Sequence, residues 1–183
     1  MAEEKKQECV LCQIIEGKVP SKKLYEDDEV LVILDMNGAM PGHSFVIPKE
    51  HFTIMEQVPD FIIGKLFSVS NKVSSAIFDT LNIQGTNIFV SNGVAAGQQI
   101  AHFMIQVVPR NENDSINLQW PTKQLNEEEM STIELRLKDE TKSIGSFEKG
   151  AGEPAHPEPT RRQPTETISS KENYLLRQLN RIP

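Results

Sequence analysis

Cysteine is scarce in this 183-residue chain, which contains Cys9, Cys12 and no others. Two cysteines cannot form the disulfide framework of a small secreted domain. The chain also lacks an apolar run near the roughly 20 residues that a membrane-spanning helix needs. Its first residues, MAEEKKQECV, lack the charged and then apolar pattern of a signal peptide. These absences predict a cytoplasmic protein that is not associated with a membrane.

Basic residues are also fewer than acidic ones: the chain has 19 Lys and Arg residues and 26 Asp and Glu residues, for a net charge of -7. An acidic chain is a poor binder of nucleic acids and membrane surfaces, although it can bind a single nucleotide. The content of 38% hydrophobic and 25% charged residues is ordinary for a globular protein. The composition therefore predicts a globular domain with no nucleic-acid partner.

Large apolar residues are nearly absent from the segment EPAHPEPTRRQPTE, near the C-terminus. Such a segment cannot bury enough surface to fold. We therefore predict a folded domain over residues 1–145 and a flexible Pro-rich linker over residues 146–168. Residues 169–183 have apolar side chains three and four apart, which predicts a short amphipathic helix. A helix of this length is marginal alone in water, so it needs a surface on this chain's own dimer or on another protein.

Within the first 145 residues, strand-like patterns occur five times, in residues 22–26, 29–35, 40–49, 86–91 and 100–109. Between the third and fourth of these, apolar residues recur every three or four positions and predict a long amphipathic helix over roughly 60–80. A last helix is expected to begin at Asn126, with Glu129 as its capping-box partner. Its apolar residues Met130, Ile133 and Leu137 are expected to face inward. This order predicts an α+β fold with an antiparallel sheet.

The fifth predicted strand carries a histidine. Alternate side chains of a strand face opposite sides of the sheet, so Ala101, Phe103, Ile105 and Val107 are expected on the core face, whereas His102, Met104 and Gln106 face the other way. These three follow a small-residue loop over 92–97, and the backbone N–H groups at Gly97-Gln98 could approach a phosphate. A lone histidine on a strand is most often structural, so His102 by itself predicts no site.

The surrounding sequence resembles the histidine-triad (HIT) family. The stretch AAGQQIAHFMIQVVPR (95–110) is similar to the family signature, in which a Gly-Gln pair leads into a strand with histidines at three alternate positions. VLVILDMNGAMPGHSFVIPKEH (30–51) resembles the first half of the family, and CVLCQIIEGKVPSKKLYEDDEV (9–30) resembles its N-terminal segment. Trp120, shortly after the signature, also suits the family. The resemblance implies an antiparallel sheet of about five strands packed on a long helix, usually assembled as a homodimer.

The signature departs from the family at two of its three histidine positions. The resemblance implies that the middle histidine attacks the α-phosphate of a nucleotide conjugate and forms a covalent nucleotidyl-histidine. That position is Met104, and a thioether cannot serve as this nucleophile. The third position is Gln106, which can still hydrogen-bond a phosphate oxygen. Since His102 and the His43 of a matching Gly-His pair are retained, we expect a degenerate triad that has lost the usual hydrolase chemistry.

Four other positions match the zinc site of many microbial HIT proteins. The resemblance implies that Cys9, Cys12, His51 and His102 hold one ion. Two thiolates and two imidazoles complete a tetrahedral zinc shell without an open position, so the metal is expected to be structural. Taken alone, the CxxC pair also fits a redox site.

The resemblance further maps a purine-nucleotide pocket onto this chain. Asp35 matches the acid that accepts the ribose hydroxyls, and Met36 matches an apolar residue that packs on the base. Without the family match, the alternative for Asp35 is an acid in the turn at a strand end, and the alternative for Met36 is a core residue. Gln98 and Gln99 match the pair that holds the α-phosphate. The full expected site is Asp35, Met36, His43, Asn92, Gln98, Gln99, Met104 and Gln106.

Three functions stay open at this point. The first is a nucleotide-binding protein without the covalent chemistry. The second is a nucleotide hydrolase or transferase with residual or altered activity that uses His43 or a water molecule. The third is an interaction subunit with a vestigial pocket and a docking tail.

Overall fold

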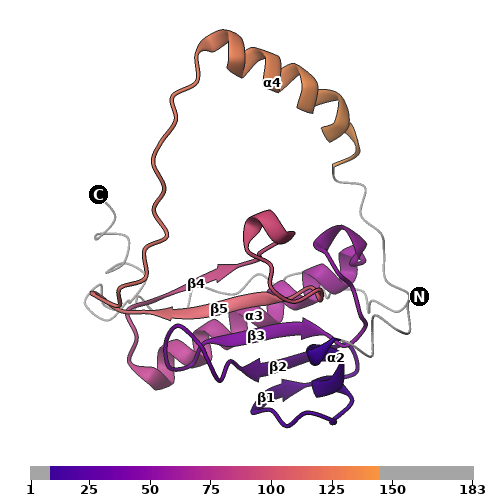
Figure 1. Ribbon diagram of the computed structural model, residues 1–183, viewed down its shortest axis with the longest axis vertical. Coiled ribbons are helices and arrows are strands. Elements are labelled where there is room, and N and C mark those ends of the chain that lie inside the picture. The colour runs from indigo at the N-terminus through magenta and orange to yellow at the C-terminus, as the bar shows by residue number, and fades with distance from the viewer. Residues whose placement is uncertain (1–8, 145–183) are drawn as a thin grey trace, which may run out of the picture. The chain divides into compact units, whose positions relative to one another are not determined.

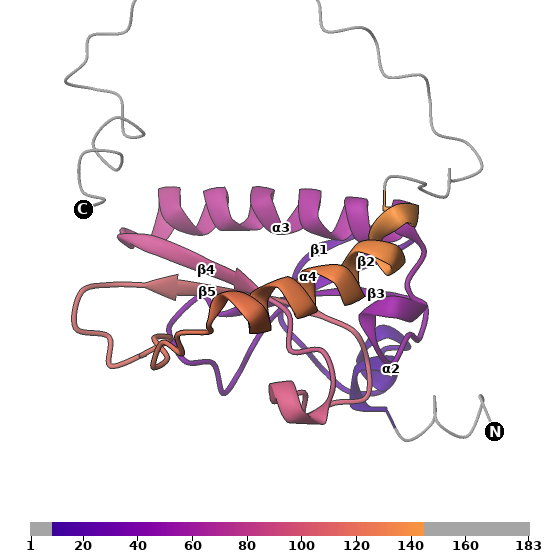
Figure 2. The same ribbon diagram turned by 90° about the horizontal axis from the view of Figure 1, so that it is seen from above.

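The computed structural model describes residues 9–144, whose strands form one sheet with a long helix along one of its faces (Figures 1 and 2). The predicted linker over 146–168 and the predicted terminal helix over 169–183 lie outside the described residues. Within the described residues, no helix is long and apolar enough to cross a membrane.

The sheet has five antiparallel strands in the order β1-β2-β3-β5-β4. The strands are β1 (Lys23–Glu26), β2 (Val30–Leu34), β3 (Ser44–Pro48), β4 (Gly85–Phe89) and β5 (Ile105–Arg110). Val32 lies opposite Val46, and Val46 lies opposite Ile105, so apolar side chains are aligned across the three central strands. The expected α+β fold with an antiparallel sheet is confirmed.

Both faces of the central strands are covered, and β2 shows why its sequence is a continuous apolar run. Val30 and Val32 belong to the core cluster on the face that packs against helix α3 (Asp60–Leu81). Leu31 and Ile33 point to the opposite face and pack with residues of helix α2 (Val10–Ile15). Side chains of a strand alternate between faces, so a strand buried on both sides needs apolar residues at every position.

Helix α3 follows from the spacing of its buried residues Ile62, Leu66, Ser70, Val73 and Ile77, which form one stripe. Pro59 at the N-cap and Asp60 in the first turn suit the start of a helix. The helix stops at Asn82, whose φ of 51° lies in the left-handed region that asparagine tolerates. Burial of the four apolar side chains contributes roughly 6–12 kcal/mol to the packing of α3 on the sheet.

The expectation that the fifth strand begins at residue 100 is wrong, because β5 begins at Ile105. The β3–β5 pairing ends at Val46 and Ile105; if it continued, Phe103 would lie beside Pro48, and a proline has no N–H for the ladder. The Pro48 carbonyl lies 3.0 Å from Nε2 of His102, and the Phe103 N–H donates to the Phe52 carbonyl. His102 and Phe103 therefore bond to the Pro48 and Phe52 carbonyls instead of extending the β3–β5 ladder. Ala101 is exposed rather than on the core face.

Helix α4 (Glu127–Glu140) has the predicted start but not the predicted packing. Its capping box is complete, because the Asn126 side chain accepts from the Glu129 N–H and the Glu129 carboxylate accepts from the Asn126 N–H. Met130, Ile133 and Leu137, expected to face inward, are all exposed. Local capping fixes where this helix forms, whereas nothing in the described residues covers its apolar side.

Three short 3-10 helices complete the described chain: η1 (Met55–Gln57), η2 (Val94–Ala96) and η3 (Thr141–Ser143). The loop over residues 35–43, which joins β2 to β3, contains two close backbone contacts. A Cβ on Gly38 would lie 2.6 Å from the Cβ of His43. Gly42 has φ +92°, and a Cβ there would lie 2.5 Å from Cδ1 of Leu81, at the end of α3. Glycine suits Gly38 because a Cβ there would clash with the His43 side chain, and it suits Gly42 because the positive φ disfavours a residue with a Cβ.

Candidate functional site

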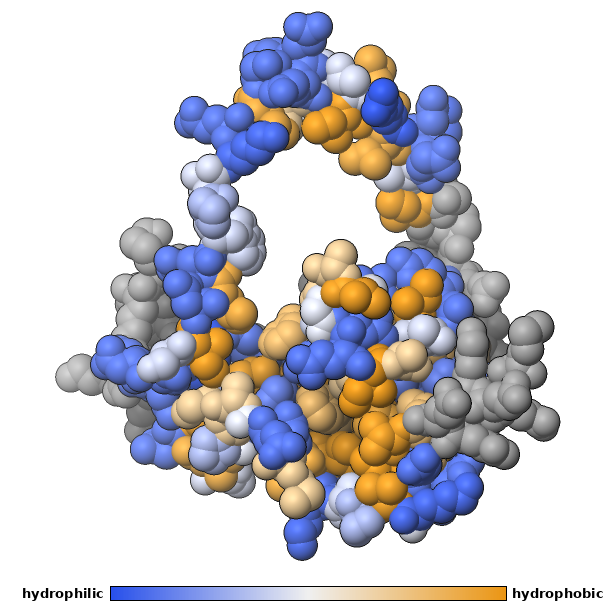
Figure 3. Space-filling view, in the orientation of Figure 1, coloured by the Kyte–Doolittle hydropathy of each residue, from blue (hydrophilic) through white to orange (hydrophobic). Residues whose placement is uncertain are grey.

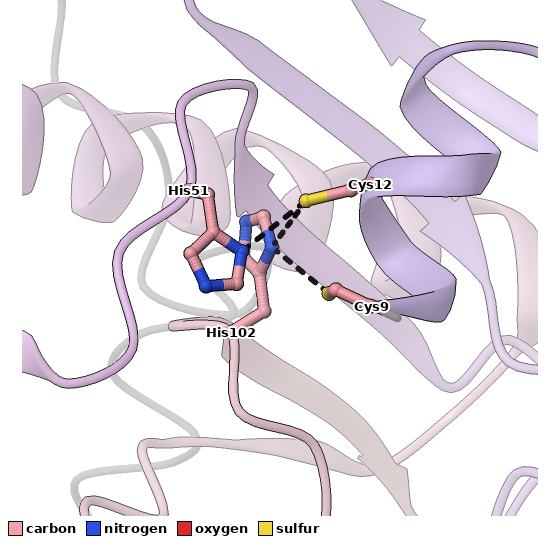
Figure 4. Close-up of side chains that lie close together, drawn as sticks. All are labelled: Cys9, Cys12, His51 and His102. Carbon is pink, nitrogen blue, oxygen red and sulfur yellow. Dashed lines mark hydrogen bonds between the residues drawn. The ribbon is translucent and has the colours of Figure 1, made fainter. Parts of the chain in front are cut away.

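Two cysteines and two histidines meet beside the N-terminal end of α2 (Figure 4). Cys9 is the N-cap of α2, and Cys12 lies three residues later, so both sulfurs fall on the same side of the first turn. His51 follows β3, and His102 precedes β5. The ligand atoms all lie within 4.8 Å of one another. The structure therefore brings together all four residues of the expected metal site from three separate parts of the chain.

The spacing of these atoms fits a tetrahedral zinc ion. With Zn–S near 2.3 Å and Zn–N near 2.0–2.1 Å, a sulfur and a nitrogen on the same ion are roughly 3.5 Å apart. Nδ1 of His102 lies 3.5 Å from Sγ of Cys9 and 3.6 Å from Sγ of Cys12. Nδ1 of His51 lies 3.2 Å from Sγ of Cys12. The cluster has the donor set and the dimensions of a zinc site.

The surroundings of His102 prepare it to be a ligand. Its Nε2–H donates to the Pro48 carbonyl at 3.0 Å, which leaves the lone pair of Nδ1 directed at the two sulfurs. The side chain is fully buried, and this burial lowers the pKa of His102 to about 4. The ring is therefore neutral at pH 7, the form that binds a metal. Cys9 and Cys12 are buried and do not form a disulfide.

A separate cavity of about 320 Å³ lies beside His43. Of the eight residues expected at a nucleotide site, six line it: Asp35, His43, Gln98, Gln99, Met104 and Gln106. Met36 is 80% exposed and is not among the lining residues. Asn92 is also elsewhere, since its side chain accepts from the Met55 N–H and donates to the Glu56 carboxylate. The cavity thus unites most of the expected set, but not all of it.

His43 is the buried polar group at this cavity. It is 6% exposed, and its Nδ1 accepts a hydrogen bond from the Ala39 N–H at 3.1 Å. Burial lowers the pKa of His43, while the Asp35 carboxylate and the Gln106 side chain oppose that effect. The neutral ring therefore carries its proton on Nε2, which has no hydrogen-bond partner among the described residues. His43 therefore has a buried N–H that lacks a partner among the described residues, beside the cavity that this residue lines.

The Gln98 and Asp35 side chains, expected to contact the phosphate and the ribose, already form hydrogen bonds within the chain. The Gln98 side chain accepts from the Gly93 N–H and donates to the carbonyls of Thr53 and Ile100. Its amide therefore shapes the loop instead of facing a ligand. Asp35 accepts from the Asn37 N–H through Oδ1, and its Oδ2 lies 3.5 Å from Nδ1 of His43.

Sequence reasoning missed several lining residues, among them Asn37, Phe45, Ser91 and Ile100. The turn chemistry of Asp-Met-Asn-Gly at 35–38 signals that Asn37 lies close to Asp35. No signal marks Ala39, because its contribution to the His43 ring is made by a backbone N–H. Phe45 points to this face because it alternates with Val46 on β3, which faces α3.

Comparison with solved structures supports both the fold and the metal cluster. A HIT family protein of Bacillus subtilis has a TM-score of 0.68 at 31% identity, covering 72% of this chain and 96% of that one. A structure described as a Zn-bound histidine triad family protein, from Mycobacterium smegmatis, has a TM-score of 0.59 at 29% identity, covering 74% of this chain and 99% of that one.

Comparison of sequences leads to the same family. The Arabidopsis thaliana protein named "Adenylylsulfatase HINT3" is 41% identical over 118 residues, which are 64% of this chain and 58% of the relative, less than two thirds of its length. The family model described as "HIT domain" matches residues 16–113. This range holds the whole sheet, α3 and the His43 cavity, and so the chain belongs to the HIT family.

Proposed function

We propose that this HIT protein binds a purine nucleotide in the His43 cavity, carries a structural zinc ion and does not form a covalent nucleotidyl-histidine. One observation carries the proposal: among the residues that line the cavity, His43 is the single imidazole, and its proton is on Nε2. His102, the retained triad position, is buried in the Cys₂His₂ cluster instead.

The chemistry of the cavity suits a nucleoside monophosphate. The Asp35 carboxylate is an acceptor for the ribose hydroxyls, while Phe45 and Ile100 provide apolar surface for a base. The Nε2–H of His43 and the amides of Gln99 and Gln106 are neutral donors for phosphate oxygens. The proposal includes nucleotide contacts by the side chains of Asp35, His43, Gln99, Met104 and Gln106, and by Gln98 through its backbone, since the Gln98 amide is already hydrogen-bonded. Met36 and Asn92 are left out of it.

The lack of covalent chemistry follows from the groups at the cavity. Met104 has no titratable lone pair near neutral pH, and a carboxamide such as Gln106 is not a nucleophile. His43 could attack a phosphorus atom only after releasing its Nε2 proton, and the Ala39 N–H on Nδ1 opposes the tautomer that would allow this. The loss of the usual nucleophile generally lowers a rate by several orders of magnitude.

Zinc would be held by Cys9, Cys12, His51 and His102, and it would have a structural role. Four protein ligands leave no coordination position for a substrate. The ion would join α2 to the segments that follow β3 and precede β5, and the residues of this cluster do not line the His43 cavity. The proposal also includes a cytoplasmic location and a homodimer.

The alternative function is a nucleotide hydrolase with residual or altered activity, and the distance between Asp35 and His43 favours it. Asp35 and His43 are 3.5 Å apart, a pairing that can activate a water molecule if the ring changes tautomer. The name of the Arabidopsis relative also denotes a hydrolase. The interaction-subunit hypothesis depends on a tail outside the described residues.

A binding titration beside a hydrolysis assay tests these functions. Isothermal titration of the zinc-loaded chain with AMP and GMP measures binding, and release of AMP from adenosine phosphoramidate or a dinucleoside polyphosphate measures turnover. Binding without turnover supports the proposal. Turnover that His43→Gln abolishes supports the hydrolase instead, and the absence of both leaves a vestigial pocket. Met36→Ala, outside the cavity, is the matched control and should leave binding unchanged.

A further inference from the structure

The described chain exposes one apolar surface on α4 and another beside α3, and the two differ in shape. Figure 3 shows hydrophobic side chains gathered along one side of α4, but the residues of this helix line neither the His43 cavity nor the second surface. The second surface is a hollow of about 610 Å³ between α3 and the β1–β2 edge of the sheet, which we call the α3 groove. Ligand sites are commonly hollows of about 300–1,000 Å³ with largely apolar walls. The α3 groove therefore has the size of a small-molecule site.

The α3 groove leads from the molecular surface to the hydrophobic core. Val73 and Ile77 line it and are buried members of the core cluster that α3 shares with the sheet. Leu24, Tyr25 and Leu81 also line it, and they are 50%, 45% and 46% exposed. Exposed apolar surface that is continuous with a groove marks a site of interaction. A ligand with an apolar part would remove these side chains from water.

The single charged residue among those that line the groove is Lys72. Its ammonium group forms no hydrogen bond or ion pair with another residue of the described chain. The hydroxyls of the other polar lining residues are already engaged. The Tyr25 hydroxyl donates to the Asp27 carboxylate, and the Thr80 hydroxyl donates to the Ala76 carbonyl. An unpaired cation beside apolar walls suits a ligand that has an anionic group and an apolar remainder.

The position of Lys72 along α3 gives such a ligand a direction. The α3 residues that line the groove run from Val69 to Leu81. Lys72 lies within one turn of Val69 but about 14 Å from Leu81 along the helix axis. The walls near Leu81 are formed by Leu34 and Gly42, which bear no charge. A ligand with its anionic group at Lys72 can therefore extend an apolar chain along α3 toward Leu81.

We propose that the α3 groove binds a free aliphatic carboxylate, with the carboxylate at Lys72 and the chain along the apolar walls toward Leu81. A monoanion fits because one ammonium group balances one negative charge, and the net charge of -7 disfavours a multiply charged ligand. The groove shares no lining residue with the His43 cavity. This site therefore goes beyond the proposed nucleotide function and does not depend on it.

Calorimetric titration of the full-length, zinc-loaded chain with dodecanoate, kept below the concentration at which it forms micelles, tests the site. One dodecanoate should bind per chain. Each buried methylene is worth a factor of roughly four in affinity, so decanoate should bind about tenfold more weakly or less tightly still. Dodecylammonium, which has the same chain and the opposite charge, should also bind about tenfold more weakly. Equal binding of dodecanoate and dodecylammonium, or the absence of dodecanoate binding, overturns the proposal.

Two pairs of substitutions locate the binding. Lys72→Glu reverses the charge at the groove and should weaken dodecanoate binding by about tenfold. Lys123→Glu makes the same change at an exposed lysine outside the groove and should leave binding unchanged. Ala76→Trp fills the groove from an exposed position on α3 and should abolish binding, whereas Ser75→Trp, at the exposed neighbouring position outside the groove, should not. Equal effects within either pair contradict the proposed site.

Other occupants of the groove give different results in the same experiments. If residues 1–8 or 145–183 of the chain cover the groove, dodecanoate does not bind to the full-length chain. If a second copy covers it, dodecanoate either does not bind or changes the mass of the sedimenting species. Each of these results overturns the proposal. Titration of the dodecanoate-saturated chain with AMP then measures nucleotide binding separately, so failure of the lipid site is distinguishable from failure of the proposed function.

Discussion

Removal of the zinc ion should release α2 while the sheet and α3 stay folded. Ordering the six residues of α2 costs roughly 6–12 kcal/mol of backbone entropy. The apolar side chains Leu11 and Ile14 are 2% and 9% exposed, and their burial returns only roughly 3–6 kcal/mol. On the face that α3 covers, the sheet has a core cluster that contains none of the α2 residues, whereas Leu31, Ile33 and Ile47 on its other face pack with α2. Metal coordination by Cys9 and Cys12 therefore has to supply the difference for α2, but not for the core.

Hydrogen exchange measured by mass spectrometry resolves these two regions. Peptides that cover residues 9–19 should be protected in the zinc-loaded chain and should exchange rapidly after chelation or in Cys12→Ser, whereas peptides from β2, β5 and α3 keep their protection. His43→Gln is the control, because it removes a buried imidazole that is outside the cluster and should leave the zinc content unchanged. Continued protection of residues 9–15 after loss of the metal would refute the reasoning.

Three further predictions concern the cavity. Asp35→Asn should reduce the stabilisation of the fold by AMP. For the wild type this stabilisation is roughly 2.7 kcal/mol when AMP is at 100 times its dissociation constant. Thermal shift measurements detect the change, with Met36→Ala as the control. The wild type should hydrolyse adenosine phosphoramidate negligibly, whereas the double variant Met104→His, Gln106→His should gain measurable turnover; a fast wild-type rate contradicts this. Burial lowers the pKa of His43, so the unfolded state binds more protons than the folded state as the pH falls. The contribution of neutral His43 to the free energy of unfolding is therefore complete above the unfolded-state pKa of about 6.5. It is lost as the pH falls from there through the folded-state pKa. Urea unfolding at pH 7 and pH 5 should show a smaller difference in His43→Gln.

The sheet and α3 could be predicted because each has a local pattern that its packing requires. Residues three and four apart define the buried side of α3, and the unbroken apolar run of β2 matches its burial on both faces. The metal cluster could be anticipated from the family resemblance, although its four residues are far apart in the sequence. Spacing alone does not bring His51 and His102 to the same place.

Three details of the site could not be read from the sequence, each for a physical reason. The residues just before β5 make contacts with distant segments, such as the bond from His102 to the Pro48 carbonyl, and these cannot be read from the local pattern. The protonation of His43 depends on a backbone N–H at Ala39, and every non-proline residue has one. The amphipathic pattern of α4 gives its apolar side correctly but not what covers it, because periodicity is the same for a core helix and for one that meets another chain.

The loop over residues 35–43 belongs to both hollows of the molecule. Asp35, Ala39 and His43 line the cavity, whereas Pro41 and Gly42 line the groove beside α3. Gly42 lies so near the end of α3 that a Cβ built on it would be 2.5 Å from Cδ1 of Leu81. The same short connection between two strands therefore borders two separate hollows, so a substitution that shifts its backbone is expected to alter the lining of both.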